Sequence, residues 1–344
     1  MSVREHASQH AAIAELPLVT RSATVREVTR MDRNRRDEAI EAVERLLDRR
    51  APKSGGARAV DPESWPTLVS TLRTAGRGGL ARRVAALHER VSRPHPMLVR
   101  ARFEVDAEFD YVAGQYVGLR YDGNSRAYSI ASALSEERLE ICVRRVPGGR
   151  LSPKLCGQLK PTDTVTIRGP HGELVLQEPS ARDIVFLATG AGVAPFKGMI
   201  DHLFATGQDS YEAHQRDVWL FLGAAWADDL PYAEHFRALQ RERENFHFVP
   251  CLSREPYLGS WDGETDYVQH ALLKHVDATG TAAPLSAPIE QRLRQTPRTG
   301  RGARLKPQEM DVYACGINAM VHSLVSTVRR LGVPPRRIES EGFG

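Results

Sequence analysis

The sequence predicts two domains, an antiparallel β-barrel and a doubly wound α/β domain with a parallel sheet, together with a small helical insertion near the N-terminus. Three observations predict this architecture. The chain has 344 residues, more than a single hydrophobic core usually serves. Candidate strands with turn-rich breaks run to about residue 177. Beyond residue 183, short apolar strands alternate with helices.

The first half of the chain is expected to form the barrel. Residues 22–32 (SATVREVTRMD) alternate apolar and polar side chains, which is typical of a half-buried strand. A second strand over residues 97–105 (MLVRARFEV) opens a series in which Gly and Pro mark the turns. Because many short strands with such breaks favour an antiparallel barrel, we expect a barrel domain over residues 20–178.

Three amphipathic stretches separate the first two strands of this barrel. Apolar residues recur at helical spacing after residue 33, from Trp65 to Leu72, and from Leu80 to Val91. They lie between the first strand and the next strand candidate, and so they look inserted. We therefore expect an inserted helical subdomain over residues 34–94.

The second half is expected to form the parallel sheet, in a domain over residues 179–344. Its candidate strands are DIVFLAT, DVWLFLGAA, FHFVPCL and DVYACG, and helical patterns follow the first, second and fourth. This alternation is typical of a doubly wound fold. Residues 276–308 are rich in Thr, Ala, Pro, Gly and Arg, so we expect a flexible insertion there.

Composition narrows the class of protein. Hydrophobic residues make up 41% of the chain and charged residues 26%, the usual range for a globular protein. Its four cysteines are too far apart in sequence for a zinc or iron–sulfur ligand run. We find no signal-peptide pattern and no apolar stretch that would cross a bilayer, so we expect a cytoplasmic protein with no transmembrane segment, no nucleic-acid partner and a monomeric state.

Charge is unevenly distributed along the chain. The net charge is +4, but the first 100 residues carry 19 Arg and Lys against 12 Asp and Glu, roughly +7. This excess favours an acidic partner. An Arg-rich compositional bias explains it equally well.

A glycine-rich loop is the first candidate site. Thr189, Gly190, Gly192 and Pro195 lie in TGAGVAP, between an apolar strand and a helix. Glycines there let the backbone approach a pyrophosphate, and the helix N-terminus favours negative charge. The motif alone is weak, since a tight turn without a ligand has the same residues.

A second candidate site follows the strand FHFVPCL. Ser253 and Arg254 offer a hydroxyl and a charged fork to a phosphate, and Tyr267 offers a flat face to an adenine. Gln269 lies close by in sequence. These residues would suit a phosphorylated adenosine, although residues of these types are more often structural.

A third candidate site is the strand RAYSIAS. Arg126 and Tyr128 share one face of this strand and Ser129 lies on the other, so successive residues can contact a phosphate, a ring and a ring edge. By propensity alone the segment is simply a good strand.

Ten motifs occur in one order: GQYV, RAYS, CVRRVPGGRLSPKLCGQLKPTD, GPHG, ATGAGVAPFKG, WLFLGAAWADDLPYAEHF, LSRE, DYVQ, YACG and a C-terminal EGF. In these motifs the chain resembles the ferredoxin–NADP reductase family, closest to its plant-type members. The resemblance covers residues 96–344 except 276–308, and residues 22–32 resemble the family's first barrel strand. It implies an FAD-binding barrel and an NADP-binding α/β domain.

The resemblance implies roles for residues in the barrel. Arg126 would hold the FAD pyrophosphate, Tyr128 would stack on the isoalloxazine, and Ser129 would hydrogen-bond near flavin N5. The turn from Gly149 to Ser152 would complete the phosphate cradle.

It also implies roles around the nicotinamide cofactor. Arg144 and the loop with Thr189, Gly190, Gly192 and Pro195 would bind its phosphates. Cys315 would lie beside nicotinamide C4, Glu341 would lie close to the redox centre, and Phe343 would cover the flavin. A last group would recognise the adenosine 2′-phosphate and favour NADP over NAD: Ser253, Arg254, Tyr267 and Gln269.

Three departures from the family pattern stand out. Family members of this type commonly end on an aromatic residue, whereas here Gly344 follows Phe343. Thr265 stands where a basic residue is expected, so one phosphate contact is missing and the preference for NADP is weakened. The helices inserted between residues 33 and 93 have no counterpart in typical members.

The resemblance implies an FAD-dependent oxidoreductase that exchanges hydride with NADP(H) and single electrons with an acidic ferredoxin or flavodoxin. Two alternatives stay open. One is the reductase component of a dedicated oxygenase system, with the helices as a docking device. The other is a non-catalytic redox-sensing flavoprotein, although such a binder has no need of Ser129, Cys315 and Glu341 together.

Overall fold

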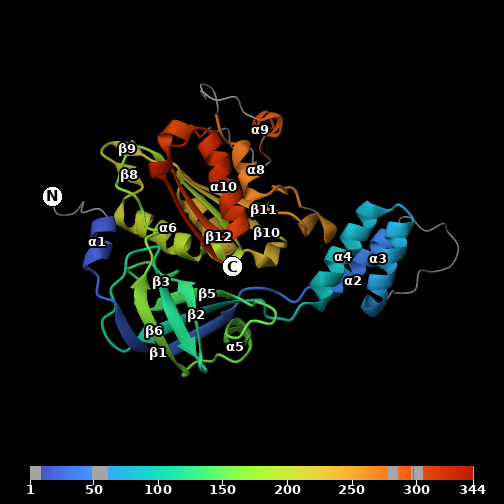
Figure 1. The fold of residues 1–344 in the computed structure, drawn as a ribbon, viewed down its shortest axis with the longest axis horizontal. Helices are drawn as coiled ribbons and strands as arrows, with labels where there is room; N and C mark the ends of the chain where they lie inside the picture. Colours follow the sequence, from blue (N-terminus) through green and yellow to red (C-terminus); the bar gives the residue numbers. More distant parts are fainter. Residues whose placement is uncertain are drawn as a thin grey trace.

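The computed structural model describes residues 9–48, 61–259, 261–277, 286–295, 297 and 305–343. These residues form a β-barrel, a parallel sheet covered by helices, and a helical unit that projects to one side (Figure 1). A short helix, α1 (Gln9–Glu15), precedes the barrel. Within the described ranges, the structure contains no helix with the length and apolar character needed to cross a membrane.

Six antiparallel strands form the barrel in the order β4-β3-β6-β1-β2-β5. A bridge between Ile130 and Ile141 brings the two edge strands together, so the barrel is nearly closed. Apolar side chains such as Phe103 and Ile167 fill its interior, and the short helix α5 (Ser152–Gly157) lies against β5. The strands are β1 (Val19–Arg30), β2 (Leu98–Val105), β3 (Tyr116–Tyr121), β4 (Asn124–Ser129), β5 (Leu139–Arg144) and β6 (Thr164–His171). The predicted barrel is confirmed, and its first strand begins three residues earlier than the sequence pattern indicates.

Five parallel strands form the second sheet in the order β11-β10-β7-β12-β13. Alternate residues of β7 face opposite sides, because side chains alternate along a strand. Phe186 packs in the core beneath α6 and α7, and Leu187 packs in the core beneath α8 and α10, so the predicted doubly wound architecture is confirmed. The elements are β7 (Asp183–Thr189), α6 (Ala194–Thr206), β10 (Val218–Ala224), α7 (Ala233–Glu242), β11 (Phe246–Leu252), α8 (Val268–Leu273), β12 (Met310–Ile317), α10 (Asn318–Arg330) and β13 (Ile338–Phe343), with a small hairpin of β8 (Ser210–Tyr211) and β9 (His214–Gln215).

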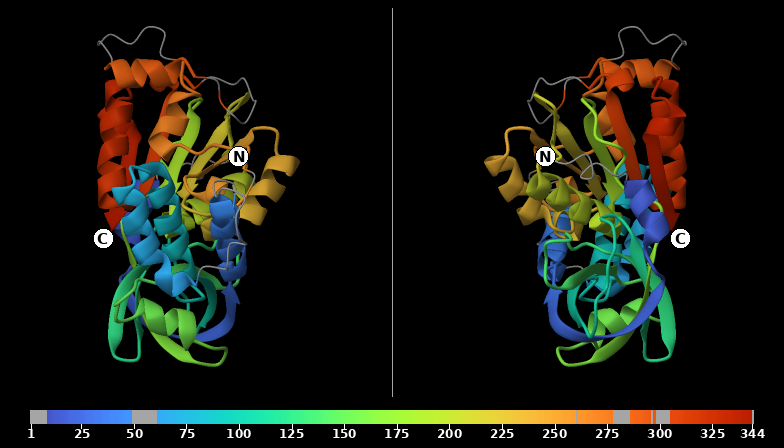
Figure 2. Two further views of the ribbon diagram at one scale, coloured as in Figure 1. Left: turned by 90° about the vertical axis from the view of Figure 1, so that its right-hand side faces the viewer. Right: turned by 90° about the vertical axis from the view of Figure 1, so that its left-hand side faces the viewer.

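The inserted helices form a unit of three: α2 (Arg36–Asp48), α3 (Trp65–Thr74) and α4 (Gly78–Ser92). They pack around the fully buried Trp65. The same apolar cluster contains Trp226 and Leu258, which follow β10 and β11 in the α/β domain. The unit therefore interrupts the barrel in sequence but docks on the parallel-sheet domain in space, and Figure 2 shows it at the height where the two domains meet.

Buried ion pairs fix this docking. The Arg90 guanidinium, with its side chain 1% exposed, donates to Asp228 at 2.5 Å. Arg93 donates to both carboxylate oxygens of Asp229, at 2.8 and 2.9 Å. Removing one partner of such a pair leaves an uncompensated buried charge, at a cost of about 3–5 kcal/mol. These contacts therefore hold the helical unit in one position.

Residues 276–308 are expected to form a flexible insertion, and the structure describes part of them. Within them the structure describes α9 (Ala287–Leu293), whose Ile289 and Leu293 pack against the second core of the sheet. A bridge between Val276 and Leu305 joins the two ends of the stretch. The four-residue spacing of the two apolar side chains explains this packing, because it places both on one helix face. Residues 278–285, 296 and 298–304 of the stretch lie outside the described ranges.

Candidate active site

The candidate site lies at the seam between the barrel and the carboxyl ends of the parallel strands. A chain of contacts crosses this seam. Ser129 of β4 pairs with Tyr116 of β3, and a Cβ atom added to Gly172 would lie 2.9 Å from the Tyr116 ring and 3.7 Å from Glu341 Oε1. Glu341 of β13 pairs in turn with Cys315 of β12. The structure thus places three of the predicted catalytic residues along one continuous path.

Burial shapes the chemistry of Glu341 and Cys315. Burial raises the pKa of the half-buried Glu341 carboxyl above its usual range. The Cys315 side chain is fully buried, and burial together with the Glu341 charge raises the pKa of its thiol. Cys315 is therefore a protonated, uncharged group, and a carboxyl able to retain a proton lies next to it.

Tyr128 and Arg126 lie on β4, opposite Val117 and Leu119 of β3. Tyr128 is half-buried, and burial raises the pKa of its hydroxyl, so the ring presents a neutral face. Arg126 is exposed and, within the described part of the chain, donates only to the neighbouring Ser125 carbonyl, at 2.9 Å. Its remaining donors are free to bind a phosphate.

The turn that was expected to complete the phosphate cradle is tightly closed. The Val146 N–H donates to Ser152 Oγ at 3.0 Å, and a Cβ atom added to Gly149 would lie 2.9 Å from the Val146 carbonyl oxygen. The Ser152 hydroxyl thus has one acceptor position in use, while its proton can still be donated to a ligand. Gly149 is the residue that lets this turn close.

The glycine loop occupies the carboxyl end of β7. It forms a short 3-10 turn, Gly190–Val193, immediately before Pro195 in the first turn of α6. A Cβ atom added to Gly192 would lie 2.5 Å from the Cys315 carbonyl oxygen, so the loop packs directly on the end of β12. Only glycine allows this approach.

Two buried polar atoms indicate that this region fits a nucleotide. Thr189 Oγ1, at the start of the glycine loop, and Gln269 Oε1, on α8, are buried and have no hydrogen-bond partner among the described residues. Buried polar groups are nearly always paired, so such atoms require a ligand or water. Both belong to residues predicted to contact the nicotinamide cofactor, and the residues present therefore fit that cofactor.

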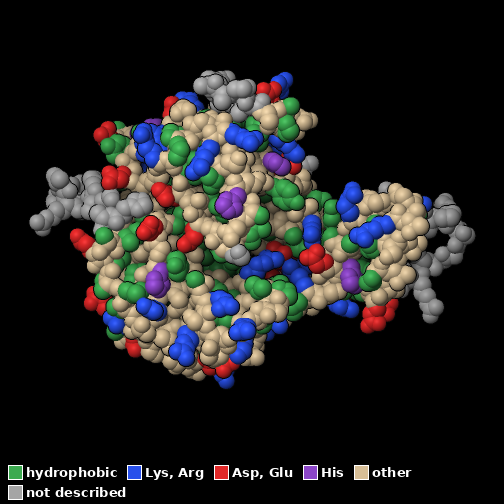
Figure 3. All heavy atoms as spheres, viewed as in Figure 1, with side chains coloured by type: hydrophobic (Ala, Val, Ile, Leu, Met, Phe, Trp, Pro, Cys, Tyr) green, Lys and Arg blue, Asp and Glu red, His purple; other side chains and the backbone are tan. Residues whose placement is uncertain are grey.

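Arg144 connects the barrel to the glycine loop. This exposed residue ends β5, and its Nη1 would lie 3.9 Å from a Cβ atom added to Gly190. The two domains thus bring a guanidinium close to the glycine loop, which is expected to bind a phosphate. Figure 3 shows further Lys and Arg side chains gathered in a hollow at this seam, beside the root of the helical unit.

The expected adenosine site lies at the carboxyl ends of β10 and β11. The N–H groups of Ser253 and Arg254 donate to the carbonyls of Ala224 and Ala225, which joins the two loops. Tyr267 is 66% exposed, so its ring face is available. Arg254 is not free, because its Nη1 donates to Glu89 Oε2 of α4 at 2.7 Å.

Phe343, expected to cover the flavin, is the last residue of β13 and lies opposite Ile317. Both side chains are exposed, Phe343 by 42% and Ile317 by 57%. An aromatic ring in this position is available to pack on a flat ligand. Gly344, which follows it, lies outside the described residues.

Sequence reasoning missed several residues of the site. Tyr116 stacks on His171 with ring centroids 5.4 Å apart, beside the path that links Ser129 to Glu341. Arg292 of α9 donates to Asp266 at 2.6 Å, next to Tyr267. No local signal marks Glu89 or Arg292, whereas Tyr116 and His171 already lie inside the GQYV and GPHG motifs.

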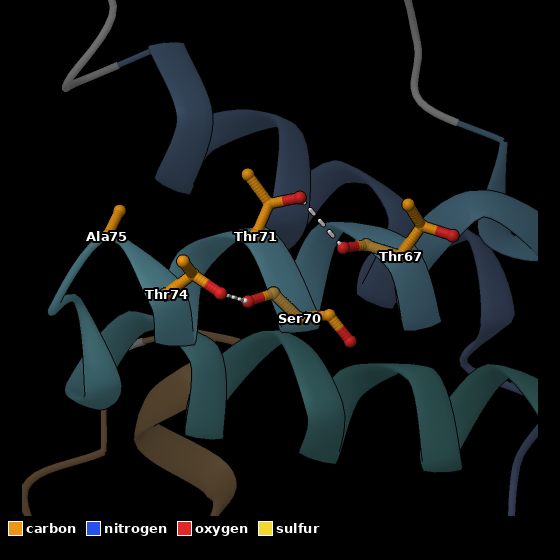
Figure 4. Close-up of a pocket in the computed structure, with 5 residues that line it drawn as sticks. All are labelled: Thr67, Ser70, Thr71, Thr74 and Ala75. Atoms are coloured by element: carbon orange, nitrogen blue, oxygen red, sulfur yellow. Dashed lines mark hydrogen bonds between the residues drawn. The ribbon is translucent and has the colours of Figure 1, made fainter.

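A separate hollow lies on α3, lined by Thr67, Ser70, Thr71, Thr74 and Ala75 (Figure 4). Thr71 Oγ1 donates to the Thr67 carbonyl at 3.0 Å, and Thr74 Oγ1 donates to the Ser70 carbonyl at 3.1 Å. The helix itself therefore satisfies these hydroxyls, and the lining contains no charged group. We assign no nucleotide site there.

Comparison with known proteins agrees with this geometry. The family described as oxidoreductase FAD-binding domain matches residues 88–176, and the family described as oxidoreductase NAD-binding domain matches residues 186–326. The chain is 31% identical over 185 residues to the phenol 2-monooxygenase reductase component DmpP of Pseudomonas sp. (strain CF600), covering 53% of this chain and 51% of that protein. It spans between 51% and 62% of the length of the first curated relatives that it matches.

Several solved structures cover almost the whole chain. The cytochrome P450 reductase GcoB of Amycolatopsis matches with a TM-score of 0.61 and 24% identity, over 95% of this chain and 71% of that chain, which supports the fold alone. Ferredoxin–NADP reductase B of Sorangium cellulosum is 31% identical over 246 residues, which cover 68% of this chain and 86% of that reductase. Since both cofactor-domain families also match in the expected order, the chain belongs to the ferredoxin–NADP reductase family.

Proposed function

We propose that this oxidoreductase takes hydride from NADPH or NADH and delivers single electrons to a protein carrier of the ferredoxin or flavodoxin type. The path from Ser129 through Tyr116 and Gly172 to Glu341 and Cys315 carries the proposal. It joins flavin-contacting positions of the barrel to nicotinamide-contacting positions of the sheet. Bound FAD would supply the conversion between two-electron and one-electron transfer.

The chain's own residues would position the two ring systems. Arg126 and the hydroxyl of Ser152 offer donors to the flavin phosphates, and the Tyr128 ring offers a stacking face. Thr189 and the backbone N–H groups of the Gly190–Val193 turn would bind the nicotinamide cofactor's pyrophosphate. Holding two reactants in fixed contact removes much of the entropic barrier to their reaction.

Glu341 would hold a proton at the edge of the reacting rings. Its raised pKa keeps the carboxyl protonated at a higher pH than a free Glu side chain. Cys315, neutral and buried beside it, would supply a compact wall that limits the access of water. Phe343 would cover the flavin until the nicotinamide replaces it.

Charge at the seam favours an acidic carrier. Lys and Arg side chains gather at the seam (Figure 3), and Arg150 and Val146, four residues apart in sequence, are both exposed, Val146 by 56%. Basic side chains together with an exposed apolar side chain suit a small, charge-steered electron-transfer contact. Binding to such a carrier should therefore weaken with salt.

A second candidate function is the reductase component of a dedicated oxygenase. The names of two relatives favour it: Phenol hydroxylase P5 protein of Acinetobacter pittii, 27% identical over 251 residues, and the DmpP reductase component. In that case the helical unit would be the docking device for the oxygenase. The two functions share the hydride step and differ only in the acceptor.

One experiment tests both functions. The purified, FAD-loaded protein is titrated with NADPH and with NADH under argon, and the flavin absorbance near 450 nm should bleach. The reduced protein is then mixed with a ferredoxin, a flavodoxin or ferricyanide at two salt concentrations. Rapid, salt-sensitive reoxidation by a carrier supports the first function, whereas reaction with ferricyanide alone supports a dedicated partner. A protein that keeps its colour with both nucleotides would refute both.

A further inference from the structure

The helical unit contributes a charged residue to the adenosine end of the site. Glu89 Oε2 on α4 accepts a hydrogen bond from Arg254 Nη1 at 2.7 Å, across 165 positions of sequence. The Arg254 side chain is 37% exposed and the Glu89 side chain 70% exposed. Exposed pairs of this kind contribute little to stability, so stabilising the fold does not explain the contact between Glu89 and Arg254.

The neighbours of both residues fix where they meet. Arg90, next to Glu89, is bound to Asp228 with its side chain 1% exposed. Glu255, next to Arg254, accepts from Arg35 Nη1 through both oxygens, at 2.9 and 3.0 Å. Each partner of the exposed pair is thus adjacent in sequence to a buried, charge-paired residue.

These buried neighbours limit how far the exposed pair can separate. The carbonyl oxygen of Leu258, which follows Arg254 by four residues, also accepts from Arg45 of α2 at 3.0 Å. The loop after β11 and helix α4 therefore form one packed assembly. Glu89 can change rotamer, but its backbone stays beside Arg254.

Arg254 is the guanidinium expected to bind the adenosine 2′-phosphate. A phosphate there would bring a charge of about −1.5 to −2 close to the Glu89 carboxylate, and like charges at such separations repel. The ribose of NADH has a 2′-hydroxyl instead. A carboxylate can accept a hydrogen bond from that hydroxyl, as acidic residues do in many NAD-binding folds.

A second feature of the site also disfavours binding of the 2′-phosphate of NADPH. Position 265, where the family resemblance leads us to expect a basic residue for the 2′-phosphate, is Thr265. The nearby Arg292 is paired with Asp266 at 2.6 Å, which is also bound by Lys274. Arg254 is therefore the guanidinium expected to bind the 2′-phosphate among the described residues of this site, and Glu89 would compete with the phosphate for it.

We propose that Glu89 determines nicotinamide cofactor specificity: the helical unit places it on Arg254, where it disfavours NADPH and favours NADH. The inference rests on the proposed function and on the assignment of Arg254. It gives the insertion a role in cofactor choice that is independent of any docking partner. Replacing the carboxylate by an uncharged group should release Arg254 for the 2′-phosphate.

Equilibrium binding provides the test. The oxidised, FAD-loaded protein is titrated with NADP+ and with NAD+ by calorimetry, for the parent chain and for Glu89→Gln. We expect Glu89→Gln to tighten NADP+ binding on the order of tenfold and to leave NAD+ within about twofold, with a smaller gain at high salt. Glu89→Lys should increase the gain further. Because Glu89 is exposed, neither variant should affect folding.

Two further variants make the result specific. Glu41→Gln is the matched control, because Glu41 lies in the same helical unit and pairs with Arg45 at 3.4 Å. It should leave both affinities unchanged. Arg254→Ala should weaken NADP+ far more than NAD+, and adding Glu89→Gln to it should then give a smaller gain in NADP+ affinity than in the parent chain, because only the charge repulsion is left to remove.

The possible outcomes separate the inference from the proposed function. An unchanged ratio of NADP+ to NAD+ affinity in Glu89→Gln, with Arg254→Ala still selective, would overturn the role of Glu89 and leave the reductase function intact. Equal loss of both nucleotides in Arg254→Ala would remove the phosphate assignment and the inference with it. A parent chain that binds neither nucleotide would overturn the function and the inference together.

Discussion

Cys315 and Glu341 lie directly opposite each other on the adjacent parallel strands β12 and β13, at the edge of the sheet that faces the barrel. The pairing places a buried thiol beside a carboxyl whose pKa is raised by burial. The described residues contain no group of three or more His, Cys, Asp or Glu that could hold a metal ion. Their shared position supports the proposal that they arrange the reacting rings.

Glu341→Gln should slow the reduction of the flavin by NADPH or NADH. The substitution keeps size and hydrogen-bonding capacity but removes the ionisable proton, and positioned acid–base groups typically contribute about 10²–10⁴-fold. Stopped-flow absorbance under argon measures the rate. The parent chain should show a pH-dependent step above the usual Glu range that the variant lacks, whereas an identical pH profile would argue for a purely steric role.

Gly192→Ala should disrupt the glycine loop. The added methyl group would lie 2.5 Å from the Cys315 carbonyl oxygen, and backbone shifts of this kind cost about 1–3 kcal/mol. We expect weaker nucleotide binding and unchanged FAD content, since the clash lies in the α/β domain. Gly259→Ala is the control, because an added methyl there meets nothing within 4 Å. An equal loss of nucleotide binding in Gly192→Ala and Gly259→Ala would contradict the explanation by a clash with Cys315.

Asp183→Asn should change the pH dependence of stability. Burial raises the pKa of Asp183 to about 6, above the model-peptide value of 3.8. The folded chain favours the protonated Asp183 carboxyl. The resulting stabilisation of the fold is present below about pH 4 and is lost as the pH rises through about 6. The variant should therefore be more stable than the parent at pH 8 by about 1–2 kcal/mol, after allowance for partial exposure.

Urea unfolding of the two proteins at pH 5 and pH 8 measures this effect. Asn retains the oxygen that accepts from the Asp217 N–H at 3.0 Å, so the hydrogen bond survives. The difference in the urea midpoint of unfolding between the variant and the parent should be larger at pH 8 than at pH 5. A gap that is the same at both values would rule out the ionisation of Asp183 as its cause.

Deleting residues 34–94 with a short linker should leave FAD bound and weaken the α/β domain. The barrel strands lie outside the deletion, but Trp226 would become exposed and Asp228 would lose the buried partner Arg90. FAD content by absorbance and unfolding monitored by tryptophan fluorescence would separate the two effects. Loss of flavin would show instead that the helices support the barrel.

Local sequence patterns predicted the two sheets and the three inserted helices because each pattern reflects side chains on the same element. Alternation identified the strand that became β1, and apolar residues at helical spacing identified α4. The pattern of residues 276–308 was dominated by Pro and Gly, which concealed α9 despite the spacing of Ile289 and Leu293.

The relationships between elements could not be predicted in this way. Trp226 lies in a motif typical of the family, and nothing near it indicates a contact with helices more than 130 residues earlier. The same holds for Glu89 and Arg254, whose pairing depends on where the helical unit docks. Family motifs led to Cys315 and Glu341, and only the register of β12 and β13 shows that they are neighbours.

The anchoring of the helical unit has a consequence for protein engineering. Moving residues 34–94 into another reductase would transfer Arg90 and Arg93 without the acids that neutralise them, Asp228 and Asp229. A successful chimera would need the loop after β10, with Trp226, to travel along with the helices. The transferable module is therefore discontinuous in sequence, with one part drawn from each domain.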